Sequence, residues 1–205
     1  MKQRKIFTLI ALIATQVLMN SPAYAAFCSL RDPVSAMQIL YKDGYQYRSI
    51  VATVTEQDRV AVKEKLPFTI HQSEVSKHTL YVLYKDRKAA GFLQARSEWA
   101  KWGLVEIAWA INLDRSLKGF YFQRCRSPEC NDSVVQSINK QLHNKNFAQL
   151  KSLLTLDGEA LSEAGKNTFS TYPTLALLVL RSALKTLAIT DISWAKYITK
   201  IESDN

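Results

Sequence analysis

The residues best suited to chemistry lie in the stretch 81–126, where aromatic and glycine residues interrupt apolar strands. Trp99 and Trp102 stand among charged residues, and Gly103 follows them directly. Indole rings stack on flat ligands, and glycine lets the backbone approach a ligand closely. We therefore expect at least one of these two tryptophans near the surface or at the rim of a cleft. Trp109 lies inside an apolar strand, so we expect it in the core.

Charged residues at the ends of these strands form a second candidate group, which consists of Arg96, Lys101, Arg124 and Arg126. If they gather at one edge they would attract a phosphate, and the alternative is that each is separately solvated. Glu106 interrupts an apolar run, where a buried carboxylate without a partner would be costly. We expect Glu106 to pair with one of the arginines and count it as a functional candidate. We interpret Glu74 and Glu98 as ordinary loop or strand-end acids.

Motifs of autonomous enzymes are missing from the sequence. The nucleophile, zinc-protease and phosphate-loop patterns of the common hydrolases and nucleotide-binding enzymes do not occur. The three histidines, His71, His78 and His143, stand outside any such motif, and we interpret them as surface or hydrogen-bonded structural residues. No spacing of Cys and His suits zinc. The sequence therefore gives no support for a hydrolase or a metal enzyme.

The N-terminus has the pattern of a secretory signal peptide. A basic start is followed by the apolar run 6–19 and by Ala23-Tyr24-Ala25, which suits a signal peptidase. We predict cleavage after Ala25, with residues 26–205 forming a single α+β domain that is long enough to bury a core. The run is too short to span a bilayer comfortably. We expect a periplasmic protein without stable membrane insertion after signal cleavage, the alternative being an uncleaved membrane anchor.

The net charge of the chain and its distribution limit the kinds of partner that the protein could bind. Loss of the signal peptide would lower the formal net charge from +9 to +6, since it removes three basic residues. The remaining charges are scattered along the chain, so we expect no nucleic-acid partner. A moderately basic surface suits an anionic ligand or an acidic protein.

Three cysteines, Cys28, Cys125 and Cys130, follow the predicted cleavage site. In an oxidising compartment the simplest count is one disulfide and one free thiol. Cys125 and Cys130 could close a local loop, whereas Cys28 and Cys125 would tie the N-terminus to a central strand. We favour Cys28–Cys125 because a chain terminus needs to be held down.

The pattern of apolar residues predicts an α+β fold, with a central, mostly antiparallel meander sheet and helices packed against it. The predicted strands are 45–54, 79–85, 89–96, 103–113 and 119–124. The fourth of these is apolar on both faces, so we expect it inside the sheet with helices on both sides.

Caps and periodicity predict the helices. Asp32 and Pro33 open a helix that runs to Tyr41, and Thr55 with Asp58 opens another that ends before Pro67. Further helices are expected at 134–142, 147–154 and 174–187. We interpret 157–167 as a polar connection. The segment 192–201 is compatible with a strand or a helix.

The strand region resembles the FMN-binding domain family, which includes peripheral subunits of membrane redox complexes and exported flavoproteins. The resemblance rests on Ala90-Gly91-Phe92, on the segment from Trp102-Gly103 to Asp114, and on Leu117-Lys118-Gly119-Phe120. It covers roughly residues 79 to 187. It implies a module that holds FMN and exchanges electrons with a redox partner protein, the flavin carrying the chemistry.

The resemblance also implies where the cofactor would bind. Trp102, Gly103, Glu106 and Arg124 come from the strands, and Ser127 comes from a Ser-Pro that stands where the family has Thr-Pro. Thr171 and Thr174 stand where the family has a Ser-Gly-Ala-Thr stretch that opens a helix, and where a phosphate would meet free N–H groups.

Glycines that the family carries are absent from both of these segments, and Gly-Ala is replaced by Tyr-Pro in the second. Covalent attachment of FMN is therefore not expected. The alternative is a flavin-free periplasmic accessory or binding protein that retains the fold without the cofactor.

Overall fold

The computed structural model describes residues 27–204. The predicted signal peptide and its cleavage site after Ala25 lie outside the described residues. Within 27–204 no helix combines the length and the apolar character needed to cross a membrane.

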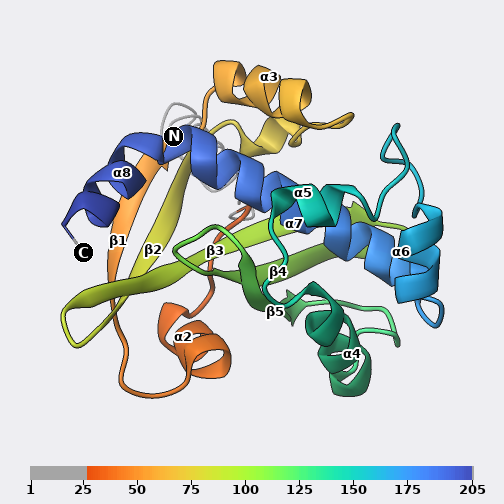
Figure 1. Cartoon of the computed structure of the whole chain (residues 1–205), viewed down its shortest axis with the longest axis horizontal. Helices are drawn as coiled ribbons and strands as arrows, with labels where there is room; N and C mark the ends of the chain where they lie inside the picture. Colours follow the sequence, from red (N-terminus) through yellow and green to blue (C-terminus); the bar gives the residue numbers. More distant parts are fainter. Residues whose placement is uncertain (1–26, 205) are drawn as a thin grey trace, which may run out of the picture.

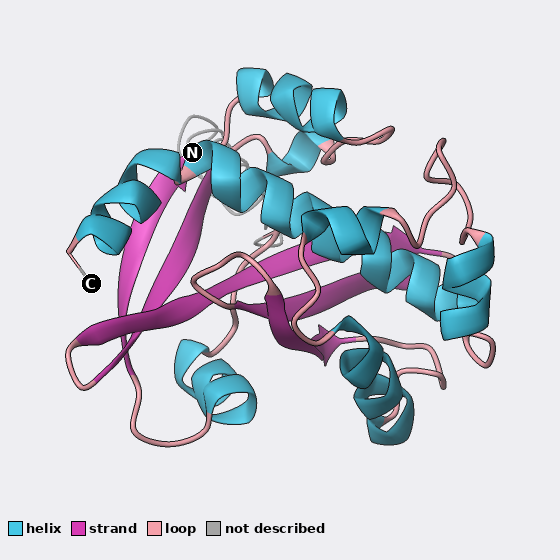
Figure 2. Cartoon of the chain, viewed as in Figure 1, coloured by secondary structure: helices cyan, strands magenta, loops and turns pink. Residues whose placement is uncertain are grey.

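The structure has an α+β fold, as predicted. Five antiparallel strands follow one another in the order β1-β2-β3-β4-β5 (Figures 1 and 2). Their bounds are β1 Gln46–Thr53, β2 Lys77–Lys85, β3 Lys88–Ala100, β4 Gly103–Ile111 and β5 Leu117–Arg124. The helices are α2 Pro33–Tyr41, α3 Glu56–Lys65, α4 Asp132–Leu142, α5 Phe147–Lys151, α6 Glu163–Thr168, α7 Pro173–Ser193 and α8 Ala195–Ser203, with a 3-10 turn, η1 Gln72–Glu74.

Helices cover both faces of the sheet. The long helix α7 lies across one face, where it packs on β3 and β4 above the larger core (Figure 1). On the other face, α2 contacts β3, β4 and β5 over a smaller apolar cluster. Residues Ile107 to Ile111 of β4 are completely buried, so this strand is an interior strand covered on both faces, as its sequence predicts. Trp109 is in the core, also as predicted.

Local signals placed most elements correctly. Asp32 caps α2, and Thr55 and Asp58 form the expected capping box at α3. Several predicted bounds need correction, and α7 runs to Ser193 rather than ending at Leu187. The segment 157–167 is more than a polar connection, because α6 begins within it, and β3 runs on to Ala100 rather than ending at Arg96. The segment 192–201, which was compatible with a strand or a helix, is helical and includes most of α8.

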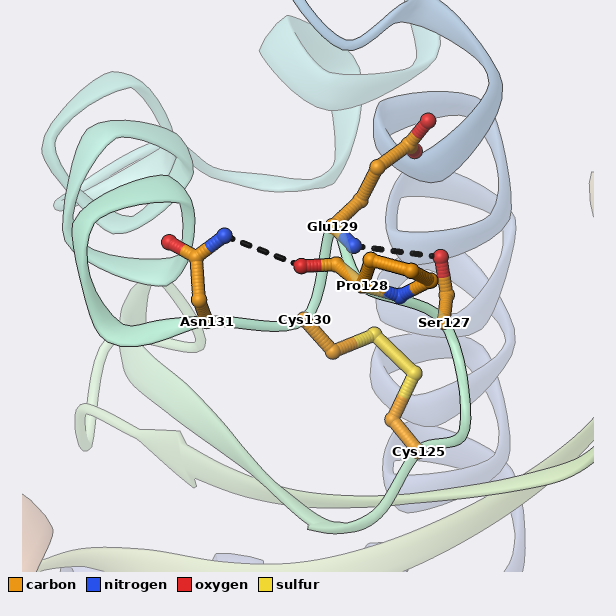
Figure 3. Close-up of a disulfide and its surroundings, with 6 residues drawn as sticks. All are labelled: Cys125, Ser127, Pro128, Glu129, Cys130 and Asn131. Atoms are coloured by element: carbon orange, nitrogen blue, oxygen red, sulfur yellow. Dashed lines mark hydrogen bonds between the residues drawn. A yellow bond between two sulfur atoms is a disulfide. The ribbon is translucent and has the colours of Figure 1, made fainter.

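The disulfide joins Cys125 to Cys130, so the favoured Cys28–Cys125 pairing is wrong and the local alternative holds (Figure 3). The chain leaves β5 at Arg124 and must reverse before Asn131 caps α4, which brings the two cysteines to a Cα separation of 6.1 Å. Cys28 is a buried free thiol, whose sulfur accepts a hydrogen bond from the Ser97 backbone N–H at 3.3 Å. The N-terminal segment is thus held by hydrogen bonds instead of a disulfide.

Selective alkylation tests this assignment. In the folded protein, Cys28 should resist iodoacetamide because the sheet covers its sulfur, whereas denaturation without reductant should expose one reactive thiol per chain. Peptide mapping of the non-reduced protein should recover one peptide with Cys125 joined to Cys130. A peptide that joins Cys28 to Cys125 would contradict the structure.

Candidate functional site

A cavity of about 340 Å³ lies between the β3–β4 turn and the N-terminal half of α7. The turn contributes aromatic and charged side chains, and the helix contributes apolar ones together with two cations. The lining residues are Glu98, Trp99, Ala100, Lys101, Trp102, Thr174, Leu177, Leu178, Arg181 and Lys185. We call this cavity the Trp102 pocket. It is within the size range of small-molecule sites.

The turn itself explains why the tryptophans lie at this pocket. Ala100 pairs with Gly103, so only two residues connect β3 to β4. Gly103 has a φ of +103°, a conformation that glycine adopts without strain. Trp102 packs against the larger core, while Trp99 is 63% exposed. The expectation that at least one tryptophan lies near the surface or at a cleft rim is therefore confirmed for Trp99 by its exposure.

Helix α7 forms the opposite wall. Pro173 occupies its first turn, and no side chain caps the free N–H groups at this end. Thr174 is exposed and lines the pocket. Arg181, one α7 cation, lies 3.2 Å from Glu159 and stacks on the ring of Phe68. The pocket thus has a positively polarised helix end and a fixed guanidinium on the same wall.

Lys185 is the other α7 cation and forms an ion pair with Glu98 at the pocket. Burial lowers the pKa of Lys185, although the Glu98 carboxylate opposes this shift. The second carboxylate oxygen of Glu98 is buried without a hydrogen-bond partner, and so is the indole nitrogen of Trp102. Polar atoms are therefore incompletely paired at this end of the interface between α7 and β3, which we call the α7 seam.

Further along the α7 seam, the polar groups are buried and include an ion pair. Arg96 and Glu74 form an ion pair in which both side chains are almost completely buried. The Arg96 Nε atom lies 3.4 Å from the Thr186 hydroxyl, and the Cys28 sulfur lies 3.5 Å from Glu74 Oε2. Burial raises the pKa of the Cys28 thiol, with Arg96 acting in the opposite direction. A protonated, covered thiol is a structural group and a poor nucleophile.

This network corrects two interpretations drawn from the sequence. Glu74 is completely buried, and Glu98 is inside the α7 seam, so neither is an ordinary loop or strand-end acid. Arg96 does not join Lys101, Arg124 and Arg126 at a common edge, because it points from mid-strand under α7.

Glu106 lies near Arg124, one of the predicted partners, but its closer partner is Arg31, which was not predicted, and both lie away from the Trp102 pocket. Its carboxylate lies 2.6 Å from Arg31 and 3.8 Å from Arg124. Glu106 alternates with Val105 and Ile107, which belong to the α7 face, so it lies on the α2 face of β4. Glu106 and Arg124 are thus on the opposite side of the sheet from Thr174.

The remaining predicted site residues are dispersed. Ser127 lies within the disulfide loop, where its hydroxyl accepts a hydrogen bond from the Glu129 N–H at 3.2 Å (Figure 3). Thr171 is exposed in the segment before α7, and neither residue lines the pocket. Of the seven residues proposed to contact a cofactor, the structure brings Trp102 and Thr174 to one cavity, with Gly103 beginning the adjoining strand.

Glu98 and Lys185 were not recognised as site residues from the sequence. The period-two pattern of β3 could have indicated Glu98, since it falls on the same face as Phe92, Gln94 and Arg96. Lys185 follows Leu184 in an apolar helix, which marks it as a buried cation in need of a partner. The three histidines make local hydrogen bonds, to Ser73, Glu74 and Lys118 respectively.

No protein-family model matches this chain, and no curated protein matches it with significant similarity. Its function must therefore be argued from the geometry of the site.

Substitution of Glu74 tests the buried network. Glu74→Gln should lower the free energy of unfolding by about 3–5 kcal/mol, because it leaves the buried Arg96 guanidinium without its counter-charge. Chemical denaturation monitored by far-ultraviolet circular dichroism measures this loss.

The matched control is Glu56→Gln, which removes the partner of Arg59 in an exposed ion pair of α3. Its effect should stay below about 1 kcal/mol. Equal losses in the two variants would show that the Arg96–Glu74 pair is not buried.

Proposed function

We propose that this protein is an exported FMN-binding module that exchanges electrons with a redox partner. One observation carries the proposal. The indole of Trp102, an aromatic group that could contact a flavin ring, and the helix start at Thr174, which the family resemblance assigns to the phosphate of FMN, line the same cavity.

The residues of the Trp102 pocket suit a flat, anionic ligand. Trp102 offers an aromatic ring to the flavin, and Leu177 and Leu178 supply an apolar wall. Of the lining cations, Lys185 pairs with Glu98 and Arg181 pairs with Glu159. Lys101 lies over the Trp102 ring and has no carboxylate partner among residues 27–204. The Trp102 pocket therefore suits a ligand that joins a flat ring to a phosphate better than it suits a neutral or cationic ligand.

The bound flavin would supply the redox chemistry. The protein's own residues would fix its position. Trp102 and the two leucines would exclude water from one side of the ring, and the free N–H groups of the first turn of α7 would attract the phosphate. Trp99, exposed at the rim, would offer an apolar contact to a partner protein.

Two features support export and non-covalent binding. The predicted signal peptide directs the chain to an oxidising compartment, and a disulfide joins Cys125 to Cys130. Thr174 stands at the helix start without the Gly-Ala that precedes the attachment threonine in the family. We expect FMN to be held only by non-covalent contacts.

A second candidate is a flavin-free periplasmic binding or accessory protein with the same fold. The specific observation in its favour is the loop 125–130. The resemblance places glycines there to admit the ring, whereas this chain has a disulfide and no glycine. The Glu106–Arg124 pair also lies on the other face of the sheet.

The visible spectrum of the exported, purified protein decides between the two candidates. We expect a flavin absorbance band that is released by acid denaturation. Apoprotein titrated with FMN should show quenching of tryptophan fluorescence, and Trp102→Ala should raise the Kd by about tenfold, since the aromatic contact and its burial contribute about 1.4 kcal/mol.

Tyr197→Ala serves as the control, because this exposed aromatic residue lies on α8. It should leave the Kd unchanged. A colourless protein whose apoprotein takes up no FMN would overturn the flavin proposal and favour the flavin-free candidate.

A further inference from the structure

Among residues 27–204, three buried side-chain atoms lack a hydrogen-bond partner, and all three come from one end of the sheet. They are Glu98 Oε1, Trp102 Nε1 and Glu129 Oε2. Glu98 and Trp102 flank the turn at which β3 passes into β4. Glu129 lies in the loop that follows β5, which ends beside the start of β4 because Arg124 pairs with Glu106. Buried polar atoms without partners are rare in folded proteins, so their concentration at one place requires an explanation.

Two of these atoms belong to residues of the Trp102 pocket, and their chemistry is complementary. The indole nitrogen can only donate a hydrogen bond, and the carboxylate oxygen can only accept one. The other oxygen of Glu98 is held by Lys185, which fixes the carboxylate in the α7 seam. The free oxygen is therefore a positioned acceptor, because its side chain cannot turn away without breaking a buried ion pair.

We propose that Glu98 and Trp102 form the polar end of the pocket and bind a flat heteroaromatic ring through an edge that carries both a ring N–H and a carbonyl. Glu98 Oε1 accepts from the ring N–H, and Trp102 Nε1 donates to the carbonyl. This proposal rests on the proposed function, because the pyrimidine-dione edge of a flavin has these groups. A purely apolar ring would leave both atoms unpaired, so the pocket selects against it.

Access to this polar end requires a movement of Trp102. Neither unpaired atom is exposed to solvent, and Lys101 lies over the Trp102 ring with its Nζ 5.7 Å from the ring centre. A ligand therefore reaches Glu98 when the indole turns on the two-residue β3–β4 connection. Binding then changes the surroundings of Trp102, which provides a fluorescence signal that does not depend on redox activity.

The test compares lumiflavin with 3-methyllumiflavin, which lacks the ring N–H and is otherwise the same ring. Tryptophan fluorescence of the full exported chain measures both Kd values. We expect the methylated ring to bind at least tenfold more weakly, because it cannot donate to Glu98. Equal Kd values would overturn the proposal while leaving flavin binding itself intact.

Lumazine, a pteridine-dione with the same edge and no flavin ring system, separates the two proposals. If FMN and lumiflavin fail to bind but lumazine binds and its N-methyl derivative does not, the flavin function is wrong and the recognition of the edge stands. If none of these rings binds, both proposals fail.

A paired substitution tests whether Glu98 causes the preference for lumiflavin over its methyl derivative. Glu98→Met together with Lys185→Met removes both charges without leaving either buried alone, and it should reduce the preference for lumiflavin over its methyl derivative to about one. The matched control replaces the exposed pair of α6, Glu163→Gln with Lys166→Gln, and should keep the preference.

Trp102→Phe provides a second route should the double variant fail to fold. It retains a ring but removes the donor, so lumiflavin binding should weaken about tenfold while the preference over the methyl derivative persists. Unchanged lumiflavin affinity in this variant would remove Trp102 from the proposal.

Discussion

The packing of α7 on β3 and β4 is the constraint on which the other features depend. An apolar helix could slide on a sheet, but α7 carries polar groups on its buried side, and each must meet a partner. The Ser182 hydroxyl accepts from the Trp109 indole at 3.1 Å, and the Thr190 hydroxyl donates to Gln94 at 3.0 Å. Between them, Lys185 meets Glu98. These contacts set the position of the helix along the strands.

That position also creates the Trp102 pocket. The polar partners engage the central part of α7, so its first turns, with Thr174 and Leu178, extend towards the end of the sheet where β3 turns back into β4. The two-residue turn supplies one indole and a lysine there, too few side chains to fill the space. A stable, charged seam and an open, aromatic cavity are thus two parts of one interface. The closed part stabilises the fold, and the open part is available to a ligand.

Local structure was predictable because its causes are local. Asp32, Thr55 and Pro173 mark helix starts through backbone chemistry within a few residues, and the apolar run of β4 predicts an interior strand. The site depends on contacts between residues far apart in the sequence, such as Glu98 with Lys185. Strand alternation indicates which face a residue occupies but not which helix covers it. The cysteine pairing is different, because Cys125 and Cys130 are five residues apart and the Ser127-Pro128 turn between them is a local signal that favours their disulfide.

The central claim is that the end of the α7 seam is a ligand site. Two-dimensional amide NMR spectra of the purified protein, recorded with increasing FMN, locate binding without assuming a mechanism. We expect shifts concentrated in residues 98–103 and 174–185. The claim would be contradicted by shifts confined to another hollow, such as the one between β1, β2 and the end of α8 that is lined by Arg48, Tyr84 and Asp204.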